Sequence, residues 1–95
     1  CPHRRLRHLL TGALLPGLTI GASTFRPWAS ANFVGARHIF PCVLAAGDGK
    51  AVGAALQAEL TASEWTLPGH IVAAVVVECE GASDALRIEV LTVED

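Results

Sequence analysis

Methionine and tyrosine are absent from this 95-residue chain, whose aromatic residues are three phenylalanines and two tryptophans. Because a chain without methionine has no initiator, we expect Cys1 to be a processed or trimmed start. With so few rings, the interior must be built mainly from small and branched side chains. A chain of this length buries only about 60–65% of the surface that its unfolded form exposes, so we expect a thin core.

Cysteine is also scarce, and its spacing is uninformative. Cys1, Cys42 and Cys79 are odd in number and form no C-x-x-C pair, which argues against a disulfide framework and against a zinc ribbon. Reduced cysteines are typical of a cytoplasmic protein, which is the location we expect. A zinc site would need two His–Cys pairs to converge, yet His70 and Cys79 lie an odd number of residues apart and so point to opposite faces of a regular strand. The sequence thus indicates no metal.

Acidic residues are missing from the first half of the chain. Residues 1–47 carry five arginines and no acid, whereas residues 48–95 carry nine acids against Lys50 and Arg87. Such asymmetry is compatible with nucleic-acid binding by the basic half, but we expect instead that the halves pair across one sheet or between subunits. The arginines of the first half are Arg4, Arg5, Arg7, Arg26 and Arg37.

The N-terminal segment lacks a long hydrophobic run. Its apolar stretch is interrupted by Pro16 and Gly17, so it is too short and too broken to span a membrane as a helix. We expect residues 1–17 to form a basic arm or a short helix that ends before the proline. Residues 4–31 also resemble a secretory signal peptide with a small-x-small cleavage site, so export is the alternative location.

Residue patterns in the rest of the chain predict two hairpins around one helix. Residues 18–33 suit an extended strand, and residues 37–44 alternate as a second strand, at an edge or bulged at Pro41, which has no N–H. Apolar residues at helical spacing follow from Val52 to Leu60, and a Pro-Gly turn precedes two more strands. We therefore expect an α+β fold in which residues 18–95 form a single ββαββ domain, with one helix crossing a four-stranded antiparallel sheet.

The third predicted strand favours burial on both faces, and one helix can cover only one of them. Residues 71–77 are uninterruptedly apolar, so both faces of that strand favour burial. One helix covers only one face of a four-stranded sheet. Either the N-terminal arm or a second copy of the chain must cover the other face, and we expect a homodimer.

No phosphate-binding loop is complete. Residues 47–50 read Gly-Asp-Gly-Lys between a predicted strand and a predicted helix, where such loops occur. A Walker loop would need glycine at Leu44 and Ser or Thr at Ala51, and a dinucleotide fingerprint would need its third glycine at Val52. We read the segment as a loop with Asp48 as the helix cap, and we expect no cofactor.

Positive and aromatic side chains gather near the first predicted hairpin. Arg37 and His38 stand at its mouth, where they could bind a small anion, although the histidine could equally satisfy a polar partner at the end of the sheet. Trp28 and Phe33 would suit stacking on nucleic-acid bases, but we expect core packing of both rings. The candidate ligand-binding residues are Arg26, Trp28, Arg37 and His38.

A catalytic function would depend on one pair of residues, a histidine and a cysteine. His38 and Cys42 lie two residues apart on one strand face, so the pattern allows a histidine-activated thiol oriented by a carboxylate such as Glu89. Nothing in the linear sequence fixes that geometry, so no residue is predicted to be catalytic. We expect a non-enzymatic module that forms homodimers or binds a ligand or partner. The alternatives are nucleic-acid binding through the basic N-terminal half and a small enzyme using His38 with Cys42.

Overall fold

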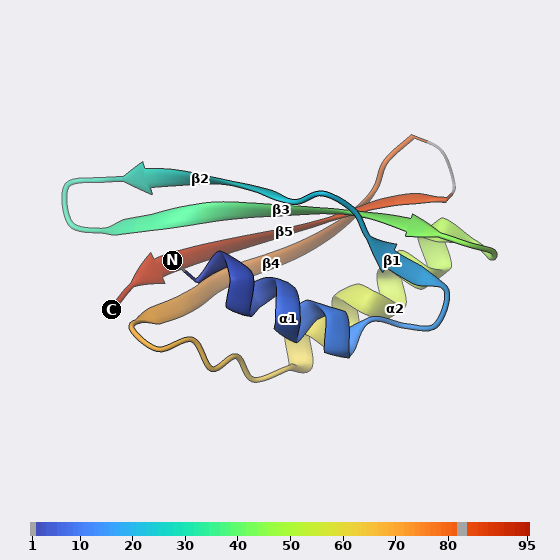
Figure 1. Ribbon diagram of the computed structural model, residues 1–95, viewed down its shortest axis with the longest axis horizontal. Coiled ribbons are helices and arrows are strands. Elements are labelled where there is room, and N and C mark those ends of the chain that lie inside the picture. Colours follow the sequence, from blue (N-terminus) through green and yellow to red (C-terminus); the bar gives the residue numbers. More distant parts are fainter. Residues whose placement is uncertain (1, 82–83) are drawn as a thin grey trace.

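One antiparallel sheet of five strands, with two helices, makes up the fold seen in the computed structural model, which describes residues 2–81 and 84–95 (Figure 1). Its strands run in the order β1-β3-β5-β4, and β2 pairs with β3 on the same side as β1. The α+β character predicted from the sequence is confirmed. The elements are α1 (His3–Ala13), β1 (Leu18–Ile20), β2 (Thr24–Ala29), β3 (Val34–Leu44), α2 (Gly49–Ala62), β4 (His70–Cys79) and β5 (Ala85–Glu94).

The predicted first strand is two strands, so the four-strand count and the simple ββαββ order are wrong. The break between β1 and β2 lies beside Pro41 of β3, whose carbonyl accepts a hydrogen bond from the Gly21 N–H at 2.7 Å. Because proline has no N–H, it cannot donate the reciprocal hydrogen bond to the Gly21 carbonyl, and the ladder stops at this point. Arg7 of α1 fills the gap, because its Nη1 donates to the Gly21 carbonyl at 2.8 Å and its Nη2 to the Ile20 carbonyl at 3.3 Å.

Pro41 also lies elsewhere in the sheet than expected. Its strand, β3, is flanked by β1 and β2 on one side and by β5 on the other, so it is not an edge strand. The irregularity that a proline requires is transferred to the neighbouring strand, where residues 21–23 leave the ladder. A proline can therefore be tolerated inside this sheet because its partner breaks.

Both helices pack on the same face of the sheet. Leu6 and Leu10 of α1 and Leu56 and Leu60 of α2 are fully buried, each pair four residues apart along one helical stripe. Their partners on β3 and β5 alternate along each strand, which places all of them on one side. The buried cluster is completed by Leu18, Phe40, Cys42, Leu44, Leu67, Leu86, Ile88 and Val90.

Helix α2 begins as the sequence predicted. The Asp48 side chain accepts a hydrogen bond from the Lys50 backbone N–H at 3.0 Å, which satisfies one of the open donors of the first turn. Gly53 faces the sheet, where a Cβ would lie 3.4 Å from Leu86 Cδ2. The small residue lets the helix approach β5 closely.

The β2–β3 hairpin reaches beyond both helices at one end of the molecule (Figure 1). This projection makes the protein elongated, with principal extents of 42 × 24 × 20 Å. Its tip is closed by the Ser30 N–H, which donates to the Phe33 carbonyl at 2.8 Å. Phe33 is exposed there, so it does not have the core-packing role that the sequence suggested.

Candidate functional site

The sheet face opposite the helices is covered by no element of the described chain, and we call it the bare face. Strand register places eighteen residues on it, and apart from Gly35 they are exposed or half-buried. Ile71 and Val76 are 54% and 42% exposed. The bare face comprises Thr19, Thr24, Arg26, Trp28, Gly35, Arg37, Ile39, Pro41, Val43, Ile71, Ala74, Val76, Glu78, Ala85, Arg87, Glu89, Leu91 and Val93.

Three of the four candidate ligand-binding residues meet in one hollow on the bare face. Arg26 lies directly opposite Arg37 in the β2–β3 ladder, and Trp28 lies opposite Gly35. With Pro27 and Leu91 they line a hollow of about 470 Å³. We call it the Arg26 hollow.

The Trp28 indole lies across a strand position that has no side chain. A Cβ on Gly35 would lie 3.0 Å from Trp28 Cζ2 and 1.9 Å from the Thr92 carbonyl oxygen. The glycine therefore allows both the close approach of β5 and the placement of the ring. The indole Nε1 is buried and has no hydrogen-bond partner among the described residues.

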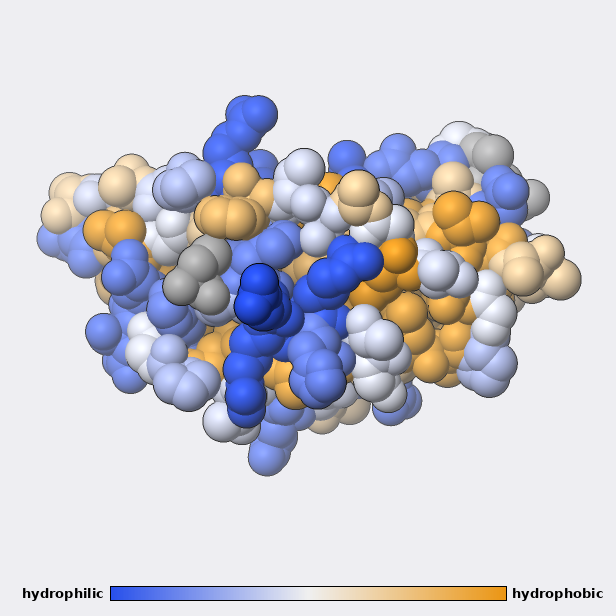
Figure 2. All heavy atoms as spheres, in the orientation of Figure 1, coloured by the Kyte–Doolittle hydropathy of each residue, from blue (hydrophilic) through white to orange (hydrophobic). Residues whose placement is uncertain are grey.

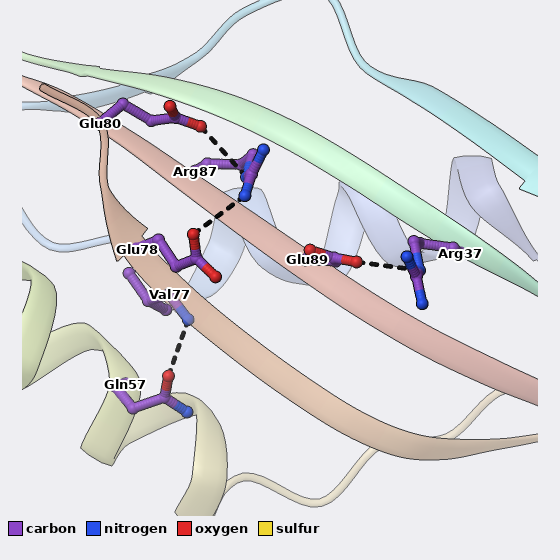
Figure 3. Close-up of polar contacts among 7 residues, drawn as sticks. All are labelled: Arg37, Gln57, Val77, Glu78, Glu80, Arg87 and Glu89. Carbon is purple, nitrogen blue, oxygen red and sulfur yellow. Dashed lines mark hydrogen bonds and ion pairs between the residues drawn. The ribbon is translucent and has the colours of Figure 1, made fainter.

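Ion pairs join Arg37 to Glu89 and Arg87 to two glutamates on the bare face (Figure 3). Arg37 Nε lies 2.9 Å from Glu89 Oε1, which offsets the repulsion between the two facing arginines. Arg87 binds two carboxylates, with Nη2 2.9 Å from Glu78 Oε2 and Nε 3.1 Å from Glu80 Oε1. In the described chain no ion pair or hydrogen bond involves the Arg26 side chain. Arg26 on β2 is thus unpaired among the described residues, while Arg87 is paired with one carboxylate more than its charge balances.

Both edges of the sheet are protected against pairing with another strand. Gln57 of α2 occupies the β4 edge, where its Nε2 donates to the Val75 carbonyl at 2.8 Å and its Oε1 accepts from the Val77 N–H at 2.7 Å (Figure 3). The other edge is β2, in which residues alternate between bonding to β3 and facing outward, starting from the bonded pair Ser30 and Phe33. By this alternation the nitrogen of Pro27 faces outward, and it has no proton to donate to another strand. Such devices oppose edge-to-edge association.

His38, the fourth candidate residue, is not in the Arg26 hollow. It lies on the helix-covered face, fully buried, because neighbouring residues of a strand point to opposite sides. Its Nδ1 is 2.9 Å from His3 Nδ1, and its Nε2 is 3.0 Å from Thr92 Oγ1. The His3 ring also stacks on Phe40, with centroids 5.0 Å apart. His38 thus joins α1 to the sheet.

The hydrogen bonds around His38 determine its tautomer. Thr92 Oγ1 donates to the Ala36 carbonyl at 3.3 Å, so it accepts from His38 Nε2–H. His38 Nδ1 is then an acceptor and receives the proton of His3 Nδ1–H. The remaining nitrogen of His3 accepts from Ser23 Oγ at 2.8 Å. The chain of bonds runs in one direction and requires both rings to be neutral.

Burial keeps both rings neutral. Desolvation, with smaller contributions from the nearby His3 and His70 rings, lowers the pKa of His38 to about 4. The pKa of His3 is also lowered, first by burial and then by the charge of Arg7. This site therefore provides packing and hydrogen bonds rather than a titratable group poised near neutral pH.

Cys42 lies on the same face as His38 but is not activated by it. Burial raises the pKa of the Cys42 thiol to about 11, against a smaller opposing effect of Arg7. Its Sγ donates to the Phe40 carbonyl at 3.5 Å, and both nitrogens of His38 have other partners. The thiol stays protonated at neutral pH, so this arrangement gives a weak nucleophile.

The five arginines of the basic half do not form one surface. Arg26 and Arg37 lie on the bare face, whereas α1, with the other three, packs on the opposite face. Arg7 is occupied by the break in the sheet, and Arg5 Nε lies 3.5 Å from the Thr66 carbonyl. Figure 2 shows strongly hydrophilic side chains over α1 at the centre of its view, beside hydrophobic side chains toward the right.

The described residues define a class, a small single-domain α+β protein with a bare sheet face. Comparisons with protein-family models, with curated proteins and with solved structures found no match to this chain. Over residues 2–81 and 84–95, no three His, Cys, Asp or Glu side chains gather in a way that could hold a metal ion. Neither described helix is long and apolar enough to cross a membrane.

Proposed function

We propose that this domain is a homodimerising binding module in which two copies pack through the bare face. The observation that carries the proposal is a sheet face that no described element covers, on which exposed apolar residues such as Ile71 and Val76 accompany an unpaired cation and an excess carboxylate. Exposed apolar residues gathered on one face and flanked by polar ones are typical of an association surface. The oligomer that they favour most often is a symmetric dimer.

The position of α1 supports the proposal that the bare face is covered by a second copy of the chain and not by the N-terminal arm. Leu6 and Leu10 are fully buried against the other face of the sheet, with Phe40 and Ile88 in the same cluster. Moving α1 to the bare face would expose these leucines and break the His3–His38 hydrogen bond. The arm is therefore committed to the side that α2 also covers.

The size of the bare face suits a stable interface. Four strands about 4.8 Å apart and nine residues long give roughly 600 Å² of projected area per copy. Standard interfaces bury about 800 Å² of accessible surface per partner, which exceeds the projected area because side chains add relief. Protection of both edges by Gln57 and Pro27 favours stacking of two faces over continuation of the sheet.

The experiment is light scattering coupled to size exclusion, repeated over a range of protein concentrations. We expect the wild type to reach twice the chain mass and Val76→Lys to remain a monomer, because a lysine beside Glu89 keeps the fold but places a charge in the interface. The matched control is Val34→Lys, at a valine that is 48% exposed on the opposite side of the sheet. A wild type of single-chain mass at every concentration would contradict the proposal.

A further inference from the structure

The two unbalanced charges of the bare face lie on its outer strands, diagonally across the sheet from each other, and we call their two positions the corners. Arg26 lies on β2 at the level of Arg37 and Leu91, and Glu78 lies on β4 at the level of Arg87. Three strand spacings separate them across the sheet, which is about 14 Å. Four residues of β5 separate the two levels along the strands, which is also about 14 Å. The line that joins the two corners therefore runs at about 45° to the strands.

A two-fold axis can exchange these corners in only one orientation. The axis must lie in the interface and run perpendicular to the line between Arg26 and Glu78, so that each residue of one copy faces the other residue of its partner. Because that line is diagonal, the two sheets then cross at about 90°, one of the two favoured angles for stacked sheets. An axis parallel to the strands would instead place Arg26 over Ala74, which offers no charge.

The charges within one copy allow Glu78 to leave Arg87 and pair with a second copy. Arg87 holds both Glu78 and Glu80, one carboxylate more than its charge requires. When Glu78 turns toward a partner, Glu80 still neutralises Arg87. Arg26 has no partner among the described residues, and the hollow beside it offers a guanidinium together with the apolar surfaces of Trp28 and Leu91. A carboxylate at the end of a short aliphatic side chain fits these properties.

We infer that the Arg26 hollow receives the Glu78 carboxylate of a second copy, reciprocally, in a dimer whose two sheets cross at about 90°. This inference rests on the proposed homodimer and adds its orientation. The two pairs lie at the two ends of the diagonal and would fix the register of the interface, while Ile39, Val76 and Leu91 supply apolar contact between them. Pairs at interface corners act mainly on specificity and register.

Charge reversal tests the orientation. Arg26→Glu and Glu78→Arg are each expected to weaken the dimer at least about tenfold, because each creates two like-charge pairs by symmetry. The double variant carrying both changes restores the opposite charges and is expected to return the dimer affinity to within about threefold of wild type. The controls are Arg4→Glu on α1 and Glu59→Arg on α2, both exposed and remote from the bare face. Sedimentation equilibrium gives the dissociation constants, and far-UV circular dichroism checks the fold.

The outcomes separate the two proposals. A wild-type dimer that is unaffected by either single reversal, or that the double variant fails to restore, overturns the crossed orientation and leaves the homodimer standing. A monomeric wild type overturns the homodimer itself. Loss of the dimer in each single variant and recovery in the double variant supports both.

Discussion

His3 and His38 share a hydrogen bond between their Nδ1 atoms, 2.9 Å apart, and this bond requires an unprotonated nitrogen on one ring and a proton on the other. The partners of the two outer nitrogens fix the direction, so His3 is the donor. Protonation of His38 at Nδ1 would set two N–H groups against each other. The link between α1 and the sheet therefore depends on pH.

The first prediction concerns stability in mild acid. Both histidine pKa values are lowered in the folded state, so the unfolded chain binds more protons below pH 6.5. Stability from the neutral rings is complete above about pH 6.5 and falls as the pH decreases toward about 4, by about 2–3 kcal/mol for His38. Urea denaturation across this range measures the change. His38→Gln should flatten the dependence, and the exposed His8→Gln should leave it unaltered; an unchanged slope in His38→Gln would contradict the assignment.

The second prediction concerns the protected β4 edge. Gln57→Leu leaves the Val75 carbonyl and the Val77 N–H without their partner, which should lower the free energy of unfolding by about 1–3 kcal/mol. The freed edge should also speed aggregation, measured by thioflavin fluorescence at raised temperature. Gln57→Glu is the control, because its carboxylate still accepts from Val77 N–H. Aggregation of Gln57→Leu no faster than that of the wild type would show that Gln57 does not protect the edge, and equal rates in the two variants would show that the bond to the Val77 N–H adds nothing.

The third prediction compares two glycines. Gly35→Ala places a methyl group 1.9 Å from the Thr92 carbonyl oxygen and should lower the free energy of unfolding by about 1–3 kcal/mol or prevent folding. Gly12→Ala has nothing within 4 Å of the added methyl and lies inside α1, so it should raise stability by about 0.5–1 kcal/mol. Thermal denaturation of both variants is the measurement. A tolerated Gly35→Ala would mean that β3 and β5 do not approach as described.

The fourth prediction concerns thiol reactivity. Cys42 is buried and its pKa is raised to about 11, so it should resist iodoacetamide until the protein unfolds. Cys79 is exposed and should react in the native state. Mass spectrometry of labelled peptides distinguishes the two sites. Fast native labelling of Cys42 would restore the small-enzyme alternative.

Local patterns allowed several features to be predicted from the sequence. The Asp48 cap depends only on residues within the first turn of α2. The turn before β4 forms as expected, with Gly69 at φ 75° and the His70 N–H donating to the Leu67 carbonyl at 3.0 Å. These interactions join residues that are close in the chain, and residue type alone encodes them.

Features that depend on strand register were missed. The break between β1 and β2 follows from the meeting of Gly21 with Pro41, twenty residues apart, and the protected edge from the meeting of Gln57 with β4. The separation of Arg37 from His38 was foreseeable, since adjacent strand residues face opposite sides. Long-range pairing decides which of two adjacent residues is buried, and residue type alone does not encode it.

The break at Gly21 divides one side of the sheet into separately anchored segments. β1 is held by three residues of β3 together with α1, whereas β2 pairs with the other end of β3 and has its own hairpin turn. Local opening of α1 and β1 can therefore occur while the β2–β3–β5–β4 ladder stays intact. We therefore expect amide exchange in residues 2–20 to follow a partial unfolding event of lower free energy than global unfolding. His3 and the buried His38 lie at the boundary of that event, so acid lowers the free energy of this partial opening first.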